Sequence, residues 1–192
     1  GKIKMGDVCN FTNLMNAVID QKSFKNVKSY IDYAKESSDA EVIIGGKCDD
    51  SVGYFVEPTV ILAKSPTFKT MVEEIFGPVI TIYVYPNEKL EETLISCDTA
   101  TSYALTGAVF AEDRGAIIKM AKKLDHAAGN FYINDKPTGA VVGQQPFGGS
   151  RGSGTNDKAG SAINLQRWMN QRTIKETLVS RRVVSYPYMS EE

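Results

Sequence analysis

The sequence contains few of the residues from which metal centres and disulfide frameworks are built. It has one histidine, His126, and three cysteines, Cys9, Cys48 and Cys97, which lie far apart and form no CxxC pair. An odd number of isolated cysteines predicts neither a disulfide framework nor a zinc site, and it favours a reducing compartment. The histidine, expected near the C-terminal end of a helix, leaves little from which to build a nucleophile–histidine triad. We therefore expect no metal and three inert thiols.

An excess of charge of one sign is also missing. The 192 residues carry a formal net charge of -1, and the basic residues are interspersed with acidic ones. This balance argues against a nucleic-acid partner, and the pair Arg181 and Arg182 is expected to be solvated. No apolar run reaches the roughly 18 residues needed to span a bilayer, so no membrane partner is expected.

The sequence begins with Gly1 rather than with methionine, and its first residues show no signal-peptide pattern. We expect either a processed chain or a piece of a longer polypeptide, with any targeting segment upstream. The length of 192 residues, with 42% hydrophobic and 23% charged residues, suits one ordinary globular domain or part of one.

Hydrophobic periodicity predicts helices and strands that alternate along the chain. Ser23 is expected to cap a helix with Phe24, Val27 and Ile31 on one face. The order of elements predicts an α/β fold with a largely parallel sheet, flanking helices and right-handed crossovers. The other expected helices cover residues 13–19, 89–96, 114–124 and 162–169, and the expected strands cover residues 41–44, 54–62, 79–85, 105–110, 130–134 and 173–179.

Two of these elements carry a prediction about burial. The strand at 79–85 is apolar on both faces, which is typical of a buried parallel strand. The helix at 89–96 is expected to direct Leu90, Leu94 and the adjacent Cys97 toward the core.

The glycine-rich stretch from Gly129 to Gly160 predicts a functional surface. A loop of this length is unusual in a compact domain, and glycine lets the backbone approach a ligand closely. It follows a predicted strand, and ligands bind at the carboxyl ends of strands in α/β sheets. Two interpretations remain open for each candidate: Lys136, Thr138, Gly139 and Ala140 form a simple turn or a nest of amides for a carboxylate, and Phe147 anchors the loop or lines a pocket.

A second candidate segment precedes the strand at 79–85. Glu73 and Glu74 are expected on a short helical turn that stops at Gly77 and Pro78. They are either a solvated pair, or a site in which Glu74 accepts hydrogen bonds from ligand hydroxyls beside the apolar wall of Phe76. Carboxylates hold ribose diols in this way in dinucleotide sites. The sequence contains neither GxxxxGK[ST] nor GxGxxG, so it predicts no standard phosphate loop.

Four segments in a fixed order resemble the C-terminal part of the aldehyde dehydrogenase superfamily. They are EEIFGPV at 73–79, LTGAVF at 105–110, GNFYIN at 129–134 and PFGG at 146–149. The resemblance covers essentially the whole chain. It implies an α/β fold that forms the C-terminal part of a catalytic domain, with NAD as cofactor.

The resemblance also implies a reaction and the residues that serve it. The reaction is oxidation of glutamate gamma-semialdehyde to glutamate with NAD, through attack of a cysteine thiolate on the aldehyde. Glu74 matches the glutamate that holds the nicotinamide ribose, and Phe76 matches the phenylalanine beside it. Gly139 and Ala140 match the loop whose amides anchor the substrate carboxylate, and Phe147 matches an aromatic wall of the aldehyde pocket.

The same resemblance places the nucleophilic cysteine and most of the dinucleotide-binding half before Gly1. Cys9 is not that nucleophile, because its surroundings, DVCNF, lack the cysteine motif of the family. We therefore expect no catalytic residue in this chain and no aldehyde oxidation by the chain alone. The alternative is a non-catalytic binding or assembly module derived from an aldehyde dehydrogenase.

The resemblance further implies a division of the chain and an assembly. Residues 1–170 are expected to belong to the catalytic domain, and residues 171–192 to a C-terminal strand and tail for oligomerisation. The strand at 173–179 would add to the sheet of a partner subunit, which implies a homodimer for the intact enzyme. The implied compartment is the mitochondrial matrix.

Overall fold

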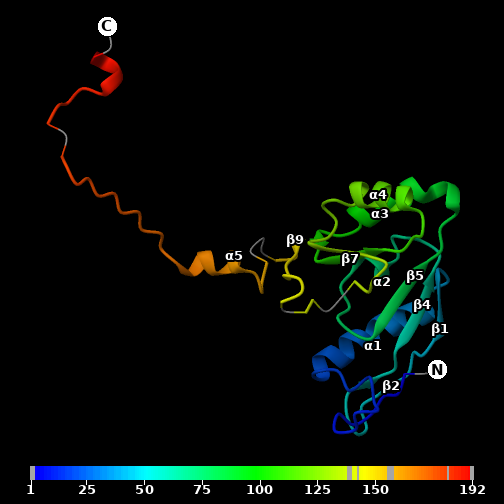
Figure 1. Ribbon diagram of the computed structural model, residues 1–192. Helices are drawn as coiled ribbons and strands as arrows, with labels where there is room; N and C mark the ends of the chain where they lie inside the picture. The colour runs from blue at the N-terminus through cyan, green and yellow to red at the C-terminus, as the bar shows by residue number, and fades with distance from the viewer. Residues whose placement is uncertain (1–2, 138–139, 142, 155–157, 181, 191–192) are drawn as a thin grey trace.

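The computed structural model describes every residue except 1–2, 138–139, 142, 155–157, 181 and 191–192. Figure 1 shows a folded body and an arm, which starts near α5 (Ala162–Leu165) and carries the C-terminus away from that body. The body has two parts, one built on α1 (Gln21–Glu36) and the other on α3 (Leu90–Thr99) and α4 (Arg114–Lys123). No helix in the described part of the chain is long and apolar enough to cross a membrane.

The first part is a three-stranded sheet with α1 packed on one face. In this sheet β4 (Thr59–Ala63) lies between β1 (Ala40–Ile44) and β5 (Val79–Tyr83); it is antiparallel to β1 and parallel to β5. Alternate side chains of a strand point to the same face, and on β4 these are the buried Thr59, Ile61 and Ala63. Ile61 and Ala63 pack with Ala34 of α1, so the core of this part is a helix-on-sheet layer. Its largest fully buried side chains are Val27, Ile31, Val56, Thr59 and Ile61.

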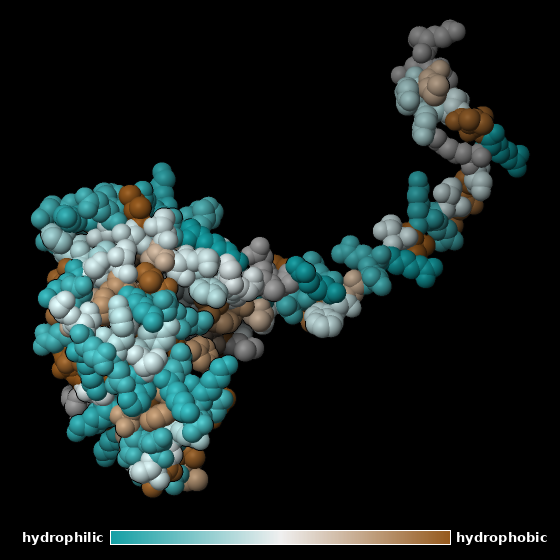
Figure 2. Space-filling model, turned by 180° about the vertical axis from the view of Figure 1, so that it is seen from behind, coloured by the Kyte–Doolittle hydropathy of each residue, from teal (hydrophilic) through white to brown (hydrophobic). Residues whose placement is uncertain are grey.

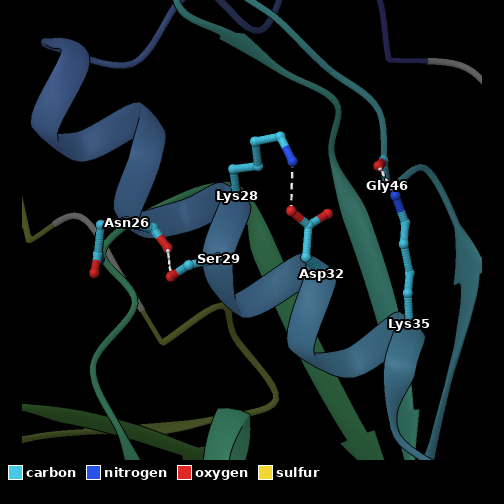
Figure 3. A network of polar contacts seen from close by, with 6 residues as sticks. All are labelled: Asn26, Lys28, Ser29, Asp32, Lys35 and Gly46. Carbon is cyan, nitrogen blue, oxygen red and sulfur yellow. Dashed lines mark hydrogen bonds and ion pairs between the residues drawn. The ribbon is translucent and has the colours of Figure 1, made fainter.

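The polar face of α1 also fixes the chain around it (Figure 3). Lys28 forms an ion pair with Asp32 one turn later, which raises the pKa of the Lys28 ammonium. Near the helix end, Lys35 Nζ donates a hydrogen bond of 2.5 Å to the carbonyl oxygen of Gly46. That contact holds the turn after β1 against the C-terminal end of α1.

The second part is a parallel pair of strands covered by two helices. β7 (Thr106–Val109) pairs with β8 (Asn130–Ile133), and Leu94, Val109 and Leu124 form the core between this pair and the helices. Asp113 caps α4 by accepting a hydrogen bond of 2.6 Å from the Ala116 amide. Shorter elements complete the body: β2 (Cys48–Asp49), β3 (Phe55–Val56), α2 (Lys69–Val72), η1 (Asn87–Lys89), β6 (Tyr103–Ala104) and β9 (Ser150–Arg151).

The arm contains α5, directly followed by η2 (Gln166–Trp168), and further along η3 (Pro187–Ser190); the described residues between η2 and η3 have no regular structure. Figure 2 shows it leaving the body as a narrow extension with apolar side chains along it. Trp168 is 83% exposed and Leu178 is 92% exposed. The expected strand at 173–179 is not formed: all seven residues are described and none belongs to a strand.

The expectation of a largely parallel sheet was wrong. The described residues form four small sheets that contain five strand pairs. Three pairs are antiparallel (β1–β4, β2–β3 and β6–β9), and only two are parallel (β4–β5 and β7–β8). Burial of β5 on both faces was also wrong, because α1 covers only one face of its sheet. Ile80 and Ile82 on the other face are 59% and 38% exposed.

Three local expectations also failed. Residues 13–19 form no helix, because nearby Asp7, Asn10 and Asn16 side chains accept hydrogen bonds from the backbone one or two residues on and hold turns instead. The cap of α1 is Asp20, which accepts a hydrogen bond of 2.7 Å from the amide of Ser23. Cys97, expected to point inward, is exposed.

Candidate functional site

The segment from Glu73 to Gly77 is held against α1 by alternate residues. Tyr30 donates a hydrogen bond of 2.6 Å from its hydroxyl to Oε2 of Glu73. Ile75 is buried, and Asn26 donates a hydrogen bond of 3.3 Å from Nδ2 to the Ile75 carbonyl oxygen. α2 ends at Val72, so the two glutamates lie in extended chain rather than on a helical turn, as had been expected.

This anchoring leaves Glu74 and Phe76 facing away from the core. Glu74 is exposed and accepts no hydrogen bond from any other residue that the structure describes. Phe76 is 84% exposed and has a φ of 55°, a left-handed conformation that costs a residue with a side chain about 1 kcal/mol or more. An exposed carboxylate and an exposed phenyl ring therefore lie two residues apart on a segment anchored to α1, and of the two only Glu74 lines the cavity beside this segment.

Glu74 borders a cavity of about 320 Å³ between the two parts of the body. Ser153, from the glycine-rich segment, and Tyr103, from β6, line it on the other side. The structure thus brings the two candidate segments of the sequence to one cavity, although more than a third of the chain separates Glu74 from Ser153. The complete lining is Met71, Val72, Glu73, Glu74, Thr101, Tyr103, Leu105 and Ser153.

Phe147 is half-buried and does not line this cavity. Its amide donates a hydrogen bond of 2.8 Å to the Ala159 carbonyl oxygen in an isolated antiparallel bridge. Ala140 is also half-buried, whereas Thr138 and Gly139 lie outside the described residues, as does Arg181 of the basic pair. The amide nest expected at Gly139 and Ala140 therefore stays a prediction.

Two residues of this region were not singled out from the sequence. Asn130, at the start of β8, uses both ends of its amide to hold the chain on either side of Phe147. Lys158 donates hydrogen bonds from Nζ to two glycine carbonyl oxygens. Their only sequence signal is an amide and an amine inside a glycine-rich stretch, which is common in ordinary turns.

Two of the described cysteines, Cys48 and Cys97, have thiols with raised pKa values. Burial raises the pKa of the Cys48 thiol, and loss of hydration raises that of Cys97 even though much of its side chain is exposed. A raised pKa disfavours the thiolate, the form that acts as a nucleophile. No group of three or more histidine, cysteine, aspartate or glutamate residues in the described ranges could hold a metal ion.

Comparison with known proteins supplies the family. The pattern of the aldehyde dehydrogenase family matches residues 1–174. The chain belongs to this family.

Among curated members of the aldehyde dehydrogenase family, the chain is similar to mitochondrial delta-1-pyrroline-5-carboxylate dehydrogenases. It is 63% identical to that of Dictyostelium discoideum over 187 residues, which cover 97% of this chain and 34% of the relative. It is 52% identical to the human protein over 189 residues, again 34% of the relative. The chain therefore spans about a third of the length of these relatives.

Solved structures agree with the sequence relatives. The delta-pyrroline-5-carboxylate dehydrogenase of Mycobacterium tuberculosis matches with a TM-score of 0.88 at 50% identity, over 100% of this chain and 35% of that one. The same enzyme bound with NAD matches with a TM-score of 0.86 over 98% of this chain and 34% of that one. The fold described above is thus that of one part of an aldehyde dehydrogenase.

Proposed function

We propose that this chain is the part of a delta-1-pyrroline-5-carboxylate dehydrogenase that holds the nicotinamide ribose and shapes the aldehyde pocket. The reaction is the oxidation of L-glutamate gamma-semialdehyde to glutamate with NAD. The observation that carries the proposal is the likeness of nearly the whole chain, at 50% identity, to a dehydrogenase of this kind bound with NAD.

The geometry of Glu74 suits an NAD ribose. Its carboxylate is exposed at the cavity edge, and an ionised carboxylate can accept hydrogen bonds from both hydroxyls of a diol. Phe76 offers an exposed apolar surface two residues away. NAD, when bound, supplies the hydride acceptor of the oxidation. Glu74 and Phe76 would hold and orient the ribose at that end of the cofactor.

The substrate would be held by the glycine-rich segment. Backbone amides at Gly139 and Ala140 would bind the carboxylate of the semialdehyde, and Phe147 would form an apolar wall of its pocket. We assign no catalytic residue in this chain, because the thiols of Cys48 and Cys97 have raised pKa values and Cys9 lacks the cysteine motif of the family.

The proposed assembly is a homodimer of the intact enzyme in the mitochondrial matrix. Residues 1–170 would belong to the catalytic domain and residues 171–192 to an oligomerisation segment. Exposed apolar side chains such as Ile174, Leu178 and Val179 support a partner for the arm. The compartment rests on the curated relatives, which are mitochondrial.

A chimeric enzyme tests the proposal directly. The matching third of the Dictyostelium dehydrogenase is replaced by these 192 residues, and reduction of NAD by glutamate gamma-semialdehyde is measured beside the parent enzyme and the isolated chain. We expect activity in the chimera and none in the isolated chain. A folded chimera that binds neither NAD nor substrate would contradict the proposal and favour a non-catalytic binding or assembly module.

A further inference from the structure

Four of the five successive backbone polar groups from the Pro146 carbonyl to the Gly148 carbonyl form hydrogen bonds within the described chain. The Pro146 carbonyl accepts a hydrogen bond, the Phe147 amide donates one to Ala159, and both the amide and the carbonyl of Gly148 are engaged. Loops rich in glycine have high backbone entropy, so holding four of these groups in place requires specific partners. Two side chains supply three of the four contacts.

The first side chain is Asn130, which is only 8% exposed. Its Nδ2 donates a hydrogen bond of 2.9 Å to the Pro146 carbonyl oxygen, and its Oδ1 accepts one of 3.1 Å from the Gly148 amide. One planar amide therefore forms hydrogen bonds with the peptide groups on both sides of Phe147. Because Asn130 is the first residue of β8, these two hydrogen bonds come from a strand of a sheet rather than from another loop.

The second side chain is Lys158, whose Nζ bridges two carbonyl oxygens. It donates hydrogen bonds of 2.6 Å to Gly129 and 2.7 Å to Gly148. No carboxylate in the described part of the chain forms an ion pair with Lys158. The ammonium is thus used to join the entrance of β8 to the residue directly after Phe147.

The close approach that Lys158 bridges also requires glycine. A Cβ added to Gly129 would lie 2.1 Å from the Gly148 carbonyl oxygen, which is backbone and cannot move aside. The two chain segments therefore touch directly, and their carbonyl oxygens converge on one amine.

We propose that Asn130 and Lys158 are positioning residues that fix Phe147 as a wall of the aldehyde pocket and so set selectivity for the aldehyde's side chain. The proposal rests on the proposed function for the identity of the pocket. A wall held at its backbone keeps its shape when different aldehydes enter, and misplacement by about 1 Å is enough to impair a site.

The first arm of the test uses the 192-residue chain and needs no activity. Hydrogen exchange is measured for the amides of Phe147 and Gly148 in Lys158→Met and in Asn130→Asp, which keeps the acceptor but loses the donor to Pro146. In Lys158→Met we expect both amides to exchange about tenfold or more faster. In Asn130→Asp we expect the Gly148 amide, whose acceptor is kept, to stay more protected than the Phe147 amide. Lys35→Met is the matched control, because Lys35 also donates from Nζ to a glycine carbonyl, far from this loop.

The second arm measures selectivity in the chimeric enzyme. Lys158→Met should raise KM for glutamate gamma-semialdehyde about tenfold while KM for NAD stays unchanged, and it should reduce the preference for this substrate over shorter aldehydes. Lys35→Met should change neither constant. An equal fall of kcat for all aldehydes with KM unchanged would show a general structural role and overturn the proposal.

The two proposals fail in distinguishable ways. A folded chimera that binds neither NAD nor substrate contradicts the proposed function, while the exchange experiment still decides whether the two side chains hold the loop. Unchanged exchange at Phe147 and Gly148 in Lys158→Met overturns the positioning role even if the chimera is active. If Lys158→Met does not fold, Asn130→Asp carries both arms, and unchanged exchange and selectivity in that variant likewise overturn the proposal.

Discussion

The hydroxyl of Tyr30 and the carboxylate of Glu73 are joined by a hydrogen bond of 2.6 Å between α1 and the segment before β5. The adjacent carboxylate, Glu74, is left at the cavity edge. Two glutamates that are neighbours in sequence therefore differ in surroundings, because Glu73 is hydrogen-bonded to α1 and Glu74 is exposed with no hydrogen-bond partner among the described residues.

Removal of the Tyr30 hydroxyl should produce a pH-dependent loss of stability. The hydrogen bond to Glu73 raises the pKa of Tyr30, so its contribution is fully present below the unfolded value of about 10 and is lost as the pH rises through the folded value. Tyr30→Phe keeps the ring that lies 5.0 Å from Lys69 Nζ. At pH 7 we expect a loss of about 1 kcal/mol or less in urea unfolding, since the group is near the surface. The gap between the two proteins should close above pH 10, and a constant gap would contradict the assignment.

Substitution of each glutamate in turn should separate their roles. In the chimeric enzyme, Glu74→Gln should weaken NAD binding about tenfold, because a neutral amide is a poorer acceptor for two hydroxyls than a carboxylate. Glu73→Gln should leave the NAD dissociation constant unchanged and lower the stability of the chain instead. Titration calorimetry with NAD measures the first effect and urea unfolding the second. Equal effects of the two substitutions on NAD binding would refute the assignment.

Replacement of Phe76 by glycine should give a more stable protein than replacement by alanine. Its φ of 55° is strained for any residue with a Cβ, and its side chain is 84% exposed, so truncation loses little burial. We expect Phe76→Gly to exceed Phe76→Ala in unfolding free energy by about 0.5 to 1 kcal/mol, net of the higher unfolded-state entropy of glycine. Chemical denaturation of both variants at one pH provides the comparison, and a more stable alanine variant would argue against the left-handed backbone.

A methyl group at Gly77 should disturb the contact between the site loop and α1. An added Cβ would lie 2.5 Å from Cγ2 of Val27, which is fully buried. We expect Gly77→Ala to cost about 1 to 3 kcal/mol, as overpacking usually does. The cost should be smaller in a Val27→Ala background, where the clashing methyl groups are gone, and a double-mutant cycle measures this coupling. Strictly additive costs would show that the two residues do not touch.

The fold was predictable where local pattern and local packing agree. The apolar stripe of residues 24–34 identified α1 because its period matches a helix that covers one face of a sheet. β1 and β8 were found within a residue of their ends, since flanking glycine or asparagine breaks the chain there. The helix expected at 13–19 failed because side-chain hydrogen bonds in that stretch compete with helical ones, which periodicity does not register.

The candidate site was predicted in its residue types but not in its construction. EEIFGP indicated a carboxylate beside an aromatic ring, and the structure adds that Glu73 is tied to Tyr30 while Glu74 is free to face the cavity. The cap at Asp20, the two hydrogen bonds of Asn130 and the bridge of Lys158 were all missed. Asn130 and Lys158 depend on partners whose distance in space the residue types alone do not specify, whereas the partner of Asp20 is the nearby amide of Ser23, the residue that had itself been expected to be the cap.

The sequence by itself determined the family, through four motifs in a fixed order, and it determined most helices and strands through their periodicity. Only the tertiary structure decided which polar side chains have partners. Hydrogen bonds between distant residues require positions within about 3 Å. That accuracy arises only when α1, β8 and the glycine-rich segment are packed together, and it leaves Glu74 without a partner among the described residues while Glu73, Asn130 and Lys158 form hydrogen bonds to distant parts of the chain.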